Sequence, residues 1–98
     1  MSEANSEARE YQWNPRIACR TLEDTAFILH ESKMVSLNEV GTFIWEQFKK
    51  PRAKSAVVDA VENEFDAPRA DIAKDVDVFV ESLLERALLV HKSGTSES

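Results

Sequence analysis

The spacing of apolar residues in this chain changes at Leu37-Asn38, and this change constrains the fold more than any other feature. Before Asn38, apolar and polar residues alternate, as in a strand with one buried face. After Asn38, apolar residues recur at helical spacing, at Val40, Phe43, Ile44 and Phe48. The pattern predicts a strand that runs directly into an amphipathic helix, so that the edge of a sheet lies beside a helical layer.

The length and charge of the chain exclude several classes of function. Its 98 residues are enough for one domain with a single core, and too few for a large enclosed cavity. The net charge of −6 argues against binding to nucleic acids or anionic membranes, because both require a basic surface. Cys19 is the only cysteine, the N-terminus does not resemble a signal peptide, and no apolar run reaches the roughly 18 residues of a membrane span. The sequence predicts a soluble, cytoplasmic protein.

The domain is expected to consist of strands followed by helices. We predict disorder over residues 1–12 and 93–98, and a folded body over residues 13–92. Short connections join the expected strands, which indicates an antiparallel meander. The expected strands lie at 17–22, 26–29 and 33–37, and the expected helices run from Asn38 to about Lys50, from 53 to 65 and from 69 to 87. The predicted fold class is therefore α+β, with a three-stranded antiparallel sheet followed by three helices.

Two residues compete to cap the first helix. Asn38 is a good N-cap, whereas Ser36 begins a capping box with Glu39. We favour Asn38, because Leu37 then remains in the strand. Glycine is less favourable than alanine within a helix, so Gly41 early in the helix predicts close packing against a strand. We expect Trp45 to lie in the core.

The third helix has an apolar stripe that is wider than one packing face requires. Its members are Ile72, Val76, Phe79, Val80, Leu83 and Leu84. Phe79 and Val80 are core residues by default.

Two groups of residues stand out by their spacing: Leu37-Asn38, Gly41 and Ile44-Trp45, and then Asp75-Val76, Phe79, Leu83 and Leu88-Leu89. With these residues at this spacing, the chain resembles the family of pyrroloquinoline quinone biosynthesis protein D. The resemblance covers about Pro15 to Val90. The resemblance implies a small winged-helix-like domain that recognises precursor peptides made by the ribosome and modified afterwards.

The resemblance also implies a mechanism without catalysis, cofactor or metal. The leader segment of the precursor adds as a strand to the third strand, and the domain presents the core of the precursor to a modifying enzyme, often a radical S-adenosylmethionine enzyme. An unpaired strand edge is independently suited to this role, because its N–H and C=O groups can pair with an extended peptide. The implied peptide-binding residues are Lys33, Met34, Val35, Ser36, Leu37, Val76, Phe79, Val80 and Leu83. The hypothesis that at least one of Phe79 and Val80 lines a groove rests on this resemblance together with the width of the apolar stripe.

Two positions depart from the family pattern. Val35 stands where an aromatic residue is often found, and Ala87 stands where a glycine often precedes the final leucines. The departures leave open whether the peptide is the quinone precursor or another modified peptide. The acidic residues of the third helix suit a basic leader, and its basic residues suit an acidic one equally well, so the sequence indicates no charge preference for the leader. The acidic residues are Asp71, Asp75, Asp77, Glu81 and Glu85, and the basic ones are Arg69, Lys74 and Arg86. A homodimer formed through the same strand edge is compatible with the fold and would block the site.

Other functions are less well supported by the residues. A winged-helix regulator that binds DNA is the main alternative, but no expected helix has the basic face that it needs. An enzyme is disfavoured because no nucleophile with an adjacent base, phosphate loop or metal motif occurs. His30, His91 and Cys19 are expected to be structural or exposed residues.

Overall fold

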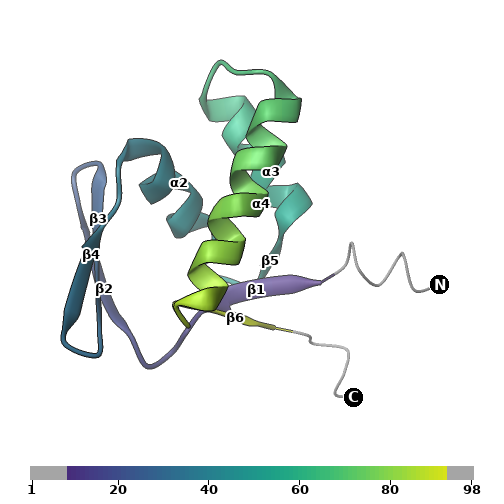
Figure 1. Ribbon diagram of the computed structural model, residues 1–98. Helices are drawn as coiled ribbons and strands as arrows, with labels where there is room; N and C mark the ends of the chain where they lie inside the picture. The colour runs from purple at the N-terminus through teal and green to yellow at the C-terminus, as the bar shows by residue number, and fades with distance from the viewer. Residues whose placement is uncertain (1–8, 93–98) are drawn as a thin grey trace.

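The computed structural model describes residues 9–92, which form two small sheets and three helices (Figure 1). The predicted three-stranded antiparallel sheet followed by three helices is confirmed, and a second sheet is added to it. The predictions of disorder for residues 1–8 and 93–98 concern segments outside the described residues. No helix in the described part of the chain is long and apolar enough to cross a membrane.

The first sheet is the predicted meander. It contains β2 (Ala18–Leu22), β3 (Thr25–His30) and β4 (Lys33–Ser36), with β3 in the middle. Glu31 and Ser32 connect β3 to β4 in a two-residue turn, and both have positive φ values, of 53° and 67°. Such a turn has the twist of the strands that it joins, so it fixes their register. His30 consequently lies opposite Lys33, and Ile28 opposite Val35.

The second sheet brings together segments that are distant in the sequence. β1 (Glu10–Trp13) lies between β5 (Arg52–Ala53) and β6 (Leu89–His91), and both pairings are antiparallel. β1 begins inside the segment 1–12, where the sequence suggests disorder, so Glu10 to Gln12 belong to the folded body. The strand has no neighbouring hairpin partner, and its alternation of polar and aromatic residues, Glu10 to Trp13, is too short to identify a strand by itself.

Three helices connect the two sheets. They are α2 (Glu39–Gln47), α3 (Lys54–Glu64) and α4 (Arg69–Glu85). α2 contacts β3 of the first sheet, and α3 and α4 pack on each other and contact β5 and β6 of the second (Figure 1). Asn38 caps α2, as predicted, because its side-chain oxygen accepts a hydrogen bond of 2.7 Å from the backbone N–H of Gly41. Gly41 is closely packed, but its nearest neighbours are the N-cap, the residue after β4 and α4 rather than the predicted strand. A Cβ there would lie 3.1 Å from Asn38 Oδ1, 3.5 Å from Leu37 and 3.6 Å from Phe79 of α4.

The joint between β4 and α2 is tied to the sheet by Thr42. Its buried hydroxyl accepts a hydrogen bond of 2.9 Å from the Ala26 N–H and lies 3.3 Å from the Leu37 carbonyl oxygen, to which it donates. Trp45 is fully buried, as expected, and Trp13 stacks on it with ring centroids 5.0 Å apart. The Trp13 indole N–H also donates to the Trp45 carbonyl at 2.8 Å. These contacts join both sheets to one helical core.

Candidate functional site

β4 is an edge strand whose outer side pairs with no other strand of residues 9–92. Leu37 N donates to Ala26 O at 3.0 Å, which continues the β3–β4 ladder past the end of the strand. In an antiparallel ladder, successive residues direct their backbone groups to alternate sides. Val35 therefore faces β3, whereas Met34 and Ser36 direct their N–H and C=O groups to the open side. This edge can accept another strand.

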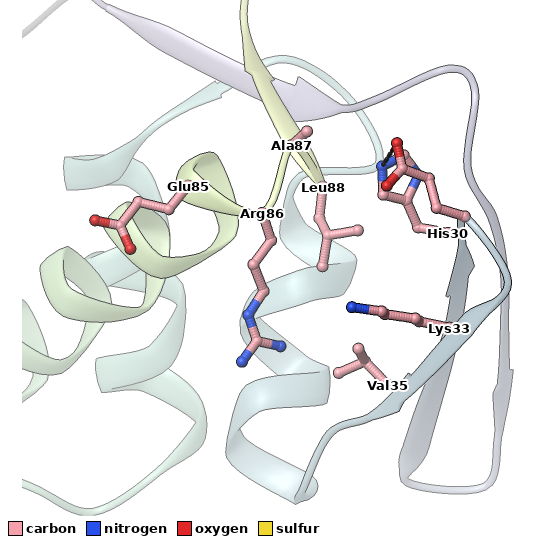
Figure 2. A pocket seen from close by; sticks show the side chains of 8 residues that line it. His30, Lys33, Val35, Glu85, Arg86, Ala87 and Leu88 are labelled. Carbon is pink, nitrogen blue, oxygen red and sulfur yellow. Dashed lines mark ion pairs between the residues drawn. The ribbon is translucent and has the colours of Figure 1, made fainter.

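A pocket of about 600 Å³ lies beside this edge (Figure 2). One wall is the end of the β3–β4 hairpin, and the other is the C-terminal end of α4. The hairpin contributes His30, Glu31, Lys33 and Val35, and the helix end contributes Glu85, Arg86, Ala87 and Leu88. The pocket therefore continues the open edge of β4 into a space that can hold side chains of an added strand.

The lining of the pocket combines apolar and positively charged side chains. Figure 2 shows Lys33 and Arg86 extending into the space between β4 and the end of α4, close to Val35 and Leu88. Glu85 extends away from this space. The pocket is therefore amphipathic and can contact a peptide through both apolar and charged groups.

The helical wall of the pocket is held in place by a capping motif. Ala87 has a φ of 61°, its N–H donates to Leu84 O at 3.0 Å, and the Leu88 N–H donates to Leu83 O at 2.9 Å. These two bonds and the left-handed residue form a Schellman motif, which ends α4. The Asn14 side chain then donates to the Ala87 carbonyl at 2.7 Å. The wall is consequently fixed by backbone hydrogen bonds within the end of α4 and by the side chain of Asn14.

The structure separates the predicted site residues into three groups. Lys33 and Val35 line the pocket, and Met34 and Ser36 supply the open backbone groups. Phe79 is half-buried and lies close to Leu37 over the first turn of α2. The remaining three residues have side chains that are at most 3% exposed and belong to the core: Val76, Val80 and Leu83.

Sequence reasoning missed most of the helical wall. In the sequence, Arg86 is one of several charges of the third helix, and Leu88 belongs to the residues that carry the family resemblance. Nothing in the sequence shows which side chains are turned toward β4 after the helix ends. The position of Ala87, where the family often has glycine, was the available signal for a left-handed helix end. That signal locates the end of the helix but not the pocket.

The outer face of the β2–β3–β4 sheet is a second apolar surface. Leu22, Leu29 and Met34 are exposed there, by 53%, 44% and 65%. Cys19 lies on the half-buried inner side of the same sheet, and burial is the main cause that raises the pKa of its thiol. A raised pKa keeps the thiol protonated at neutral pH, so Cys19 is poorly suited to act as a nucleophile.

Comparison with known proteins identifies a family and a fold. The sequence model of the family described as "Coenzyme PQQ synthesis protein D (PqqD)" matches residues 25–89, more than half of the chain. The fold is similar to that of the structure titled "TbiB1 in Complex with the TbiA(beta) Leader Peptide", with a TM-score of 0.75. The similarity covers 80% of this chain and 93% of that chain, at 22% sequence identity. No curated protein sequence matches this chain.

Proposed function

The chain belongs to the family of coenzyme PQQ synthesis protein D, and from this membership we propose that it is a non-catalytic adaptor for a ribosomally made precursor peptide. The leader of the precursor adds as a strand to β4, and its side chains enter the pocket beside α4. The adaptor then presents the core of the precursor to a modifying enzyme of the radical S-adenosylmethionine type. The family description suggests the pyrroloquinoline quinone pathway as the place of this reaction.

The observation that carries the proposal is the open edge of β4 beside a pocket. Met34 and Ser36 offer backbone donors and acceptors along the edge, and the pocket lies within reach of side chains on one face of an added strand. Backbone pairing supplies affinity and register, and the pocket supplies selectivity. The structurally similar TbiB1 was solved with a leader peptide, which supports a peptide as the ligand.

A site of this kind can promote the reaction by binding the peptide alone, without catalysing a step itself. A peptide held by an adaptor that also contacts the enzyme reaches the enzyme at a high effective concentration, because the second encounter becomes intramolecular. The solvent-exposed face of α4 carries Asp71, Asp75, Asp77 and Glu81, and this negative surface favours a peptide ligand over duplex DNA.

Amide chemical shifts test the proposal directly. We expect the leader regions of precursors encoded beside this gene, added to the ¹⁵N-labelled chain, to shift the amides of residues 33–37 and of 85–88. A sequence-scrambled leader is the control and should produce no such pattern. If no leader shifts these amides, even with the neighbouring modifying enzyme present, the adaptor function is wrong. Shifts confined to other surfaces would contradict the site.

A further inference from the structure

Two basic side chains extend into the pocket at the end of α4, although the chain as a whole is acidic. Lys33 enters it from β4 and Arg86 from the end of α4 (Figure 2). Neither takes part in an ion pair among the described residues. Of the two acidic residues in the lining, Glu85 extends away, and Glu31 lies next to His30, with Oε2 3.8 Å from Nε2. Both cations thus enter the space without an ion-pair partner among the described residues.

The same pocket has an apolar side. Val35 is half-buried and Leu88 is almost fully buried, and both border the space that Lys33 enters. Lys33 and Val35 are two residues apart on β4, so their side chains share the face that is turned toward α4. A strand added along β4 presents its own side chains to this face with the same spacing of two residues.

We propose, on the basis of the strand addition proposed above, that the leader carries an acidic and an apolar residue two positions apart. The carboxylate lies between Lys33 and Arg86, and the apolar side chain lies against the half-buried Val35. A guanidinium can hold a carboxylate through two parallel hydrogen bonds, which fix position as well as charge. A one-residue slip would turn both side chains to the opposite face, so this pair of contacts also selects the register of the leader.

The charge of the rest of the molecule makes this contact selective. The chain has a net charge of −6, and α4 is acidic along its exposed face, so most of the surface repels an acidic segment. An acidic segment is attracted to the pocket, where cations lie beside partly apolar walls. Opposite charges interact more strongly there, because water is partly excluded. An acidic leader is therefore directed to the end of α4 and away from its middle.

A selection experiment with random peptides tests the proposal without knowledge of the natural precursor. A display library of short random peptides is selected on the full chain, and the binding site of each recovered peptide is located from the amide shifts of residues 33–37. We expect peptides that bind there to be enriched in Asp or Glu at two residues from an apolar position, in either order.

Two double variants distinguish the effect of the charges in the pocket from the effect of the net charge of the chain. We expect Lys33→Gln with Arg86→Gln to weaken binding of the selected peptides about tenfold or more, as for loss of a charge-assisted contact. The matched control is Lys50→Gln with Lys74→Gln, which removes the same charge at exposed positions outside this pocket. We expect the control to bind within about twofold of the unmodified chain, because salt screens distant charges. Charge reversal, with Lys33→Glu and Arg86→Glu, should select basic peptides instead.

The outcomes distinguish this inference from the function on which it rests. Peptides that bind along β4 without acidic enrichment, or that bind the two double variants equally well, overturn the inference and leave the adaptor function intact. A library that yields no peptide bound at β4 overturns both.

Discussion

Ala87 shows how a single residue sets the geometry of the proposed site. Its backbone lies in the left-handed region, where the Cβ of any residue other than glycine meets the adjacent carbonyl. The Schellman motif at the end of α4 requires this conformation, because its two hydrogen bonds form only when the chain reverses at this residue. The wall that carries Arg86 is therefore built at a local cost.

Replacing Ala87 by glycine should stabilise the protein. Glycine adopts the left-handed region without steric strain, so Ala87→Gly is expected to raise the free energy of unfolding by about 1 kcal/mol in urea denaturation. Ala73→Gly is the matched control, because Ala73 is exposed within α4, and it should lower the stability by about 1 kcal/mol. Equal effects of the two substitutions would show that the cap carries no such strain.

Single residues also show what the sequence could reveal. The N-cap role of Asn38 was predictable, because capping depends on the few residues that follow. The neighbours of Gly41 were not, because one of them is Phe79, almost forty residues away. The opposing pair of Lys33 and Arg86 was hidden for the same reason: each charge is visible in the sequence, but their meeting depends on how α4 ends.

At the scale of one element, β4 combines two functions on its two edges. Val35 and Leu37 hold the strand to β3, and Met34 and Ser36 leave their backbone groups open. Substitutions at Met34 or Ser36 can therefore alter the open edge while the pairing of β4 with β3 is left intact.

Proline scanning of β4 should separate binding from folding. Met34→Pro removes one N–H on the open side, so we expect peptide affinity to fall about three- to tenfold, the equivalent of one hydrogen bond. Val35→Pro removes an N–H that faces β3 and should destabilise the fold by about 3 kcal/mol or more. Met34→Ala controls for loss of the exposed side chain. Calorimetric titration and urea denaturation measure the two effects, and equal affinity of Met34→Pro and Met34→Ala would exclude pairing at this edge.

The elements differed in how well the sequence predicted them. β2, β3, β4 and α2 lie in consecutive hairpins and a capped joint, so local alternation and turn chemistry were sufficient to find them. β1 and β5 are four and two residues long and pair only with distant segments, so any local alternation was too short to identify them as strands. On α4 the stripe of apolar residues was correctly identified, but periodicity cannot tell a core residue such as Val80 from one that borders a groove.

At the scale of the whole molecule, the second sheet holds the pocket wall at the end of α4 in place. β6 follows directly from the end of α4 and is held by β1, so the pocket wall at Leu88 depends on the attachment of the N-terminal strand. Tyr11 of β1 is buried, contacts the Phe48 ring edge-on with centroids 6.3 Å apart, and lies 5.0 Å from the ring centroid of His91. One aromatic residue thus joins the N-terminal strand, the end of α2 and the C-terminal strand.

Truncating Tyr11 should therefore affect both stability and binding. Tyr11→Ala leaves a cavity in the core and is expected to lower the free energy of unfolding by about 3 kcal/mol, whereas Val78→Ala, at an exposed position, should change it by less than about 0.5 kcal/mol. Because β6 loses its anchor, hydrogen exchange should increase over residues 86–91 before it increases in β2–β4. Peptide affinity should then fall under conditions in which the variant is still folded, although Tyr11 is not one of the residues that line the pocket. An unchanged affinity in the folded variant would show that the open edge of β4 binds the peptide without the wall at the end of α4.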